Sequence, residues 1–316
     1  MASEPIVTVF DLPVGKHSPV WDSKLWIDYL VLTKPEVNFL IVVTTFAGFY
    51  LGCPSAGHDF PFLRSVNAVL GTLMVASGTA ALNQYVERRF DAQMRRTSRR
   101  PLAAGRVNPS TVLWFGVALS VLGSVYLAAA VNLLASLLAL GTSLSYLFFY
   151  TPLKRKSPLC TLVGAFSGAM PPLIGWAAAS GRLNLGAWIL YCVLFLWQFP
   201  HFMSIAWMYR EDYARAGYLV LPHDERARER LVNWQTLLPL VLLAVVSLLP
   251  ALTRQSGVAY AVGTLLLCAG FLYCGAQFAL RKSNSAARRL LAASIIYLPA
   301  LLVLMILLRV GSAGLY

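Results

Sequence analysis

Nine apolar runs constrain the fold of this chain more than any other feature. A helix that crosses a bilayer needs about 20 predominantly apolar residues, and each run comes close to that length. The runs cover residues 36–52, 66–86, 111–130, 132–150, 159–180, 185–209, 232–252, 258–280 and 290–308. Charged residues make up only 12% of the chain, against about a quarter in a soluble domain. The sequence therefore predicts an all-α, polytopic membrane protein with nine transmembrane helices.

The basic residues gather in every second loop between these runs. If the N-terminus is cytoplasmic, 22 of the 26 Lys and Arg fall in cytoplasmic segments and 4 fall outside. The positive-inside rule therefore predicts a cytoplasmic N-terminus. The net charge of +13 comes from these short loops, which argues against nucleic acid as a partner and suits an anionic substrate in a lipid bilayer.

The organisation that we expect is a single membrane domain. Residues 1–35 form a polar cytoplasmic segment, and residues 36–309 form the transmembrane domain. Two long cytoplasmic loops, 87–110 and 210–231, cap one end of it. The first residues show neither a cleavable signal nor an Arg/Ser-rich transit pattern, so we expect a bacterial plasma membrane as the location.

The most informative stretch is NQYVERRFDAQMRRTSRRPL, residues 83–102. Asn83, Glu87, Asp91 and Arg95 follow one another at steps of four, and on a helix such positions stack along one face. Acids at membrane depth are costly and normally face a protein interior or a wet cavity, where they serve a function. An amide oxygen and two carboxylates suit Mg²⁺, which takes few protein ligands beside substrate phosphates.

Basic residues near this stripe add a phosphate-binding character. The guanidinium groups of Arg96 and Arg100 match the geometry of phosphate oxygens. In the later loop we assign a substrate contact to Lys154, while its neighbours set membrane topology. The alternative is a positively charged helix end whose acids pair locally, for instance Asp91 with Arg95.

A second polar stretch, WQFPHFMSIAWMYREDYARAGYLVLP, covers residues 197–222. Asp212 meets the first acidic stripe if the two helices are neighbours; otherwise it is a solvated acid after a helix end. His201 lies among aromatic residues, where a histidine is by default a packed, hydrogen-bonded side chain. Imidazole also ligates haem iron or takes a proton near neutral pH. The surrounding aromatic residues would give an apolar wall for a large planar or isoprenoid substrate.

Together these motifs resemble the UbiA-type intramembrane prenyltransferases. The pattern ERxxDxxMxRT at 87–97 is similar to the haem O synthase (protohaem IX farnesyltransferase) branch of that family. WQxPHF at 197–202, DYxxAG at 212–217, YTPLKR at 150–155 and SIxYLP at 294–299 agree in order with the same branch. The resemblance covers roughly residues 30–300.

The resemblance implies a nine-helix bundle around a central cavity, and transfer of the farnesyl group of farnesyl diphosphate to a vinyl group of haem B. Mg²⁺ would assist ionisation of the diphosphate, and water addition would give haem O. The implied metal ligands and catalytic residues are Asn83, Glu87, Asp91 and Asp212. The implied diphosphate-binding residues are Arg88, Arg96, Arg100 and Lys154. The implied haem-binding residues are His201, Trp197, Phe202 and Tyr213.

Two departures from the general family pattern leave alternatives open. Glu87 stands where many members have Asp, and Asp212 with Glu211 replaces a well-spaced pair of aspartates. Another acceptor, such as a quinone precursor or chlorophyllide, is one alternative, and a non-catalytic haem or anion transporter is the other. The implied partners beyond the substrates are a downstream haem-modifying enzyme or terminal oxidase assembly factors.

Overall fold

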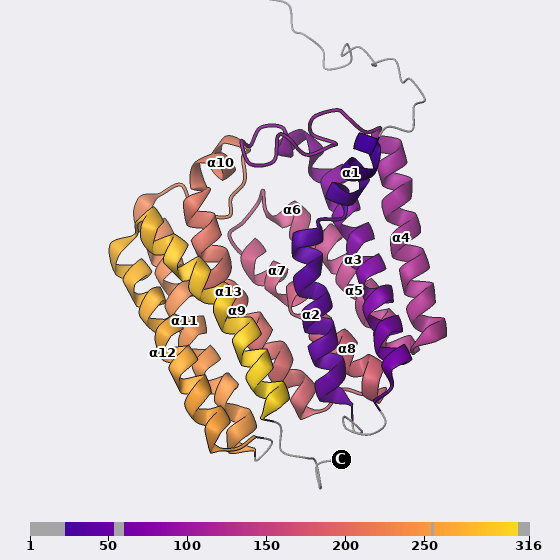
Figure 1. Ribbon diagram of the computed structural model, residues 1–316. Helices are drawn as coiled ribbons and strands as arrows, with labels where there is room; N and C mark the ends of the chain where they lie inside the picture. The colour runs from indigo at the N-terminus through magenta and orange to yellow at the C-terminus, as the bar shows by residue number, and fades with distance from the viewer. Residues whose placement is uncertain (1–22, 54–59, 254–255, 309–316) are drawn as a thin grey trace, which may run out of the picture.

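The computed structural model describes residues 23–53, 60–253 and 256–308 of the chain, and these are predominantly helical (Figure 1). Within that part, nine helices are long and apolar enough to cross a membrane, which confirms the predicted number. They are α2 (Pro35–Gly52), α3 (Phe62–Asp91), α4 (Pro109–Ala130), α5 with its continuations (Leu133–Leu153), the pair α7 and α8 (Cys160–Ser180), α9 (Leu185–Met208), α11 (Glu225–Leu252), α12 (Val258–Arg281) and α13 (Asn284–Leu307). Two shorter helices, α1 (Ser23–Leu32) and α10 (Arg210–Arg215), lie outside these spans.

Two helices begin about one and a half to two turns earlier than the apolar runs predict. The predicted starts at residues 232 and 290 become Glu225 in α11 and Asn284 in α13. Asp224 accepts a hydrogen bond from the backbone N–H of Ala227 at 2.7 Å, and the cap before α13 is Ser283. These side chains satisfy backbone donors that the first turn of a helix leaves free, so polar residues extend both helices beyond the apolar run.

The helix that carries the acidic stripe continues from Phe62 through Asp91, as predicted, and then stops. The backbone N–H of Met94 bonds the carbonyl of Asp91 at 3.3 Å, and the chain turns away over the next residues. The expected further step of the stripe to Arg95 is therefore wrong. The stripe consists of Asn83, Glu87 and Asp91.

The fifth predicted span breaks into α7 (Cys160–Gly168) and α8 (Met170–Ser180). Pro171 and Pro172 lie in the first turn of α8, and because proline has no backbone N–H to continue the helix, they account for the break. Beyond it, α8 packs tightly on α2. The two backbones approach so closely that a Cβ added at Gly48 or Gly175 would overlap the other helix. Small residues allow such close helix contacts inside a membrane.

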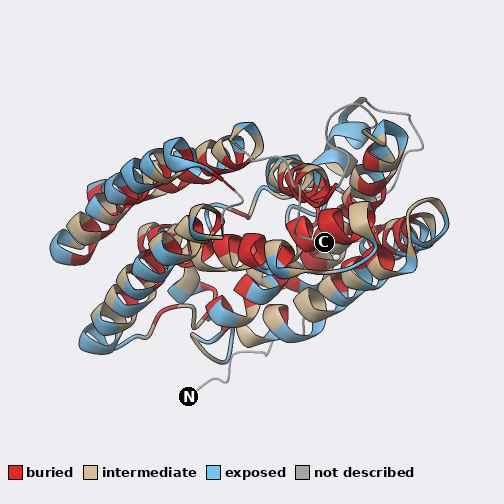
Figure 2. Ribbon diagram, turned by 90° about the horizontal axis from the view of Figure 1, so that it is seen from below, coloured by how far each residue is buried: buried red, intermediate tan, exposed pale blue. Residues whose placement is uncertain are grey.

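The helices form a bundle in which the N-terminal and C-terminal parts of the chain lie on opposite sides (Figure 1). Helix α3 packs on α2 and α4, whereas α11, α12 and α13 pack on α9 or on one another. Buried residues gather where helices face one another, and exposed residues lie outside (Figure 2). Helices α1 and α10 lie at the same end as the C-terminus of α3 (Figure 1).

Part of the expected N-terminal segment, residues 1–22, lies outside the described residues. The part that is described includes α1, a helix that the sequence does not predict. Its position beside α3 matters for the site, because residues 33–34 join α1 to α2 next to the acidic stripe.

Candidate active site

The last three turns of α3 hold the stripe in a buried environment. Asn83, Glu87 and Asp91 are 0%, 5% and 2% exposed. The Asn83 side-chain amide donates to Glu87 Oε2 at 3.0 Å and to Oγ1 of Thr151 at 3.2 Å. The amide and the carboxylate at i and i+4 therefore contact each other as the spacing predicts, and Thr151 at the end of the fourth span fixes the amide orientation.

Each carboxylate of the stripe is paired with a cation from another segment. Lys154 Nζ lies 2.8 Å from Glu87 Oε1, and Arg100 Nη1 lies 2.7 Å from Asp91 Oδ2. Asp91 therefore pairs with Arg100, nine residues further along the chain, and not with Arg95 as in the local alternative. Burial lowers the pKa of Lys154, but Glu87 more than offsets this, and the pKa of Lys154 stays well above its usual value.

Lys34 is a third cation of the cluster, and sequence reasoning assigned it only to membrane topology. Its Nζ donates to Asn83 Oδ1 at 2.7 Å. Its backbone has a φ of 53°, in the left-handed region that costs a non-glycine residue about 1 kcal/mol or more. Burial and then the charge of Arg100 lower the pKa of Lys34 to about 7. A strained backbone and a partly buried cation at one position indicate a functional role.

Aromatic rings surround the Lys154 amine. Its Nζ lies 4.5 Å from the ring centroid of Tyr150 and 6.0 Å from that of Tyr146. Both tyrosines lie in the π-helical turn η1 (Tyr146–Tyr150), and such turns are often found at functional sites. The rings stabilise a cation here whether or not Glu87 is its partner.

Tyr218 is a further residue that sequence reasoning missed. It is 3% exposed, and its buried hydroxyl has no hydrogen-bond partner among the described residues. Burial raises the pKa of Tyr218, and the negative charge of Glu87 raises it further. The ring packs against Phe90 and Tyr213, with centroids 6.0 Å and 6.1 Å away. The hydroxyl faces the Glu87 carboxylate without a hydrogen bond of good geometry, so its proton is available to a ligand.

The cluster fits a divalent cation in chemistry. Its oxygen atoms belong to two carboxylates and one amide, which is the donor set of a hard cation. Asp212 from α10 remains a predicted ligand: its carboxylate accepts from Arg215 at 3.2 Å. Within the described residues, no three His, Cys, Asp or Glu side chains come together as a metal site. Two acids with an amide would therefore hold the metal together with substrate oxygens.

Two predicted diphosphate-binding arginines contact other groups. Arg88 donates to the Tyr85 carbonyl at 2.6 Å, within its own helix. Arg96 is exposed, and its guanidinium lies 5.1 Å from the ring centroid of Tyr209 at the end of α9. Of the four predicted residues, the structure therefore brings Arg100 and Lys154 to the acids.

His201 lies at the contact between α9 and α13. Its Nδ1 is 2.8 Å from Oγ of Ser294, and its ring stacks on Trp197 with centroids 4.8 Å apart. The Trp197 indole N–H donates to the Ser294 carbonyl at 2.8 Å, and Phe202 meets the histidine ring edge-on. The predicted aromatic cluster around His201 is therefore present. Ser294 belongs to the SIIYLP motif, so two sequence motifs form one contact.

Comparison with known protein sequences finds a matching family and similar proteins. The UbiA prenyltransferase family model matches residues 41–308. A protein of Solibacter usitatus named protoheme IX farnesyltransferase is 48% identical over 295 residues, which cover 90% of this chain and 99% of the relative. A protein of the same name from Salinibacter ruber is 42% identical over 89% of this chain and 98% of its own.

Solved structures share the fold at low sequence identity. A digeranylgeranylglyceryl phosphate synthase superposes with a TM-score of 0.72 at 18% identity, over 90% of this chain and 98% of its own. A UbiA homologue of Archaeoglobus fulgidus bound to DMAPP and Mg²⁺ gives a TM-score of 0.61 at 15% identity, over 89% and 100% of the two chains. The family match over most of its length and the relatives at 42–48% identity show that this chain belongs to the UbiA prenyltransferase family.

Proposed function

We propose that this protein transfers the farnesyl group of farnesyl diphosphate to a vinyl group of haem B, with addition of water, to give haem O and diphosphate. The observation that carries the proposal is the buried cluster at the end of α3, where two acids and an amide each contact a cation. The names of the relatives from Solibacter usitatus and Salinibacter ruber support haem and farnesyl as the substrates.

The cluster suits a magnesium diphosphate because its charges can exchange partners. Asn83, Glu87 and Asp91 would hold Mg²⁺, with Asp212 as the expected ligand from the opposite side. The ion would supply positive charge to the diphosphate oxygens. The UbiA homologue of Archaeoglobus fulgidus bound to DMAPP and Mg²⁺ supports this assignment.

The three cations of the cluster would then bind the diphosphate. Lys154 and Arg100 contact the two acids, and Lys34 contacts the Asn83 amide, so all three would be freed when these groups take a metal. The leaving diphosphate gains negative charge as its C–O bond to the farnesyl carbon breaks. Cations placed there before the reaction stabilise this charge and lower the activation barrier. Such preorganised electrostatic stabilisation is usually the largest single contribution to catalysis. The unpartnered hydroxyl of Tyr218 would donate to the same oxygens.

The acceptor needs no activated side-chain nucleophile. The vinyl π-electrons of haem B would form the C–C bond to the allylic carbon, whose C–O bond to diphosphate breaks. The positive charge would then lie on the vinyl carbon next to the porphyrin ring, where water adds and gives up one proton, which the released diphosphate can accept. The apolar surroundings of the membrane helices exclude other water from the farnesyl cation. Trp197, Phe202 and Tyr213 would contact the porphyrin, and His201 would ligate the iron or direct the water.

The location and partners follow from the same proposal. We place the charged end of the bundle and the N-terminus on the cytoplasmic side of a bacterial plasma membrane, because that end carries most of the basic residues. Residues 36–309 would act as one domain, with the segments around 92–108 and α10 covering the site. The product would pass to a haem-modifying enzyme or to oxidase assembly factors.

The test is direct. The detergent-purified protein is incubated with haem B, farnesyl diphosphate and Mg²⁺, with and without chelator, and the porphyrins are separated and weighed by mass spectrometry. A heavier, more hydrophobic haem that is absent with chelator is the expected result. Unchanged haem with folded protein would reject haem as the acceptor, and flux into proteoliposomes without a covalent product would favour a transporter.

A further inference from the structure

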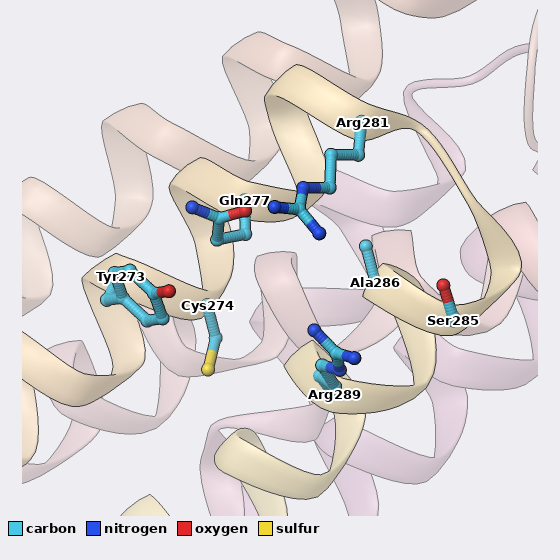
Figure 3. Close-up of a pocket in the computed structure, with 7 residues that line it drawn as sticks. All are labelled: Tyr273, Cys274, Gln277, Arg281, Ser285, Ala286 and Arg289. Atoms are coloured by element: carbon cyan, nitrogen blue, oxygen red, sulfur yellow. The ribbon is translucent and has the colours of Figure 1, made fainter.

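A small pocket between the last two helices brings together two arginines that the proposed reaction does not use. It is lined by Tyr273, Gln277 and Arg281 of α12 and by Ser285 and Arg289 of α13. The guanidinium groups of Arg281 and Arg289 turn toward one another from the two helices (Figure 3). The site therefore concentrates positive charge where two helices meet.

Neither of these arginines has an acidic partner among the described residues. The neighbouring Lys282 pairs with Glu229 at 3.5 Å, so an acid is in reach of this turn but serves another cation. Guanidinium groups stay protonated in proteins, and two that face one another repel. The other polar groups of the lining are a phenol, an amide and a hydroxyl, which can all donate to an anion. Phosphate oxygens match the fork of donors on arginine.

The surroundings of the pocket indicate a ligand with a long apolar part. The pocket itself holds about 30 Å³, room for one or two water-sized groups, so the body of a ligand must lie outside it. On the adjoining turns, Leu266 and Tyr273 of α12 and Ile296 of α13 are 70%, 66% and 65% exposed. A Cβ added at Gly270 would meet no atom within 4 Å, so the surface there is open to an alkyl chain.

The pocket also lies at the end of the bundle where the basic residues gather. Arg210, which follows α9, donates to the Asn284 side chain at the start of α13 over 3.1 Å. The turn between α12 and α13 is therefore beside α10, at the same end as the candidate active site (Figure 1). The helix ends place it at headgroup level, where basic pockets between membrane helices bind anionic lipid headgroups.

We propose that Arg281 and Arg289 bind the phosphate of an anionic phospholipid whose acyl chains lie along the exposed faces of α12 and α13. The site is separate from the candidate active site, and its occupancy does not depend on the proposed reaction. The lipid is expected to brace the two last helices, because it contacts both of them.

Native mass spectrometry of the delipidated full-length protein tests the proposal. Phosphatidylglycerol and phosphatidylcholine with identical acyl chains are titrated against the wild type, Arg281→Gln, Arg289→Gln and the double variant. Each lost charge should weaken phosphatidylglycerol binding about fivefold and leave phosphatidylcholine binding unchanged. The control is Arg288→Gln, since Arg288 is an exposed arginine of the same helix that does not line the pocket, and it should bind like the wild type.

Three results would overturn the proposal. One is equal affinity of the wild type for the two lipids, and another is a double variant that binds phosphatidylglycerol as Arg288→Gln does. The third comes from thermal unfolding of the same protein. If inorganic phosphate raises the melting temperature as much as phosphatidylglycerol does, the occupant is a soluble anion and not a lipid. The double Arg→Lys variant guards against loss of folding: it keeps both charges and should retain most of the preference for the anionic lipid.

Discussion

Oγ of Ser294 lies 2.8 Å from Nδ1 of His201, and the contact joins segments 93 residues apart in the chain. The same hydroxyl lies 2.6 Å from the Leu291 carbonyl, to which it donates its only proton. The arrangement that satisfies both contacts has Ser294 accept from the histidine, which assigns the proton to Nδ1 and the lone pair to Nε2. A lone pair on Nε2 is what an iron ligand or a proton acceptor requires.

His201→Ala should shift the haem Soret band if His201 ligates the iron, and Ser294→Ala should weaken haem affinity about 10- to 100-fold, as loss of a partner behind a metal ligand typically does. Ser294→Thr keeps a hydroxyl and should restore the affinity. The measurement is a haem titration followed by absorption. An unchanged Soret band in His201→Ala would remove the ligand role and leave His201 as a residue that directs water or packs.

Lys34→Gln should lower kcat/KM for farnesyl diphosphate about ten- to a hundredfold, because it removes a charge-assisted contact inside the site. Haem affinity should not change. Lys156→Gln is the matched control, since Lys156 is an exposed lysine on a neighbouring loop. Steady-state kinetics in both substrates separates the cases, and equal losses for haem and diphosphate would argue for a structural role of Lys34.

The sequence predicts the parts of this protein that depend on local pattern. Apolar length gives the nine spans, and the spacing of four gives the Asn83–Glu87 contact and the buried position of Asp91. It does not give Lys34 or Tyr218, because both reach the acids only through the packing of separate segments. A lysine just before the first span resembles any topogenic charge, and Tyr218 resembles any loop tyrosine. The left-handed backbone at Lys34 has no signature in sequence. Nothing in the sequence indicates that Asp91 pairs with Arg100 and not with Arg95.

Substitutions of Glu87 and Lys154 should have non-additive effects on the free energy of unfolding, whereas each should abolish turnover. Lys154→Met leaves a buried carboxylate without its cation and should cost about 3 kcal/mol of unfolding free energy. The double variant Glu87→Gln with Lys154→Met removes both charges and should regain most of that loss while remaining inactive. Unfolding in detergent and product analysis measure the two effects. A double variant with wild-type turnover would remove both residues from the proposed mechanism.

Gly175→Ala should destabilise the bundle by roughly 2 kcal/mol or more, because the added Cβ would overlap the Thr45 carbonyl of α2. Gly141→Ala is the control: a Cβ there meets no atom within 4 Å, and alanine favours helix more than glycine does. Thermal unfolding compares the two variants. Equal stability of both would show that α2 and α8 are less closely packed than their glycines indicate.

Mg²⁺ and diphosphate should stabilise the protein cooperatively. Mg²⁺ alone must displace Lys154 from Glu87 or Arg100 from Asp91 and leave a partly buried cation without its anionic partner, which is costly. Diphosphate supplies that partner, so the two ligands together should raise the melting temperature by more than the sum of their separate shifts. Asp91→Asn should lose the excess and all turnover while staying folded in detergent. A full shift from Mg²⁺ alone would mean that the acids bind metal without exchanging their cations, and the coupling inferred from the paired cluster would be wrong.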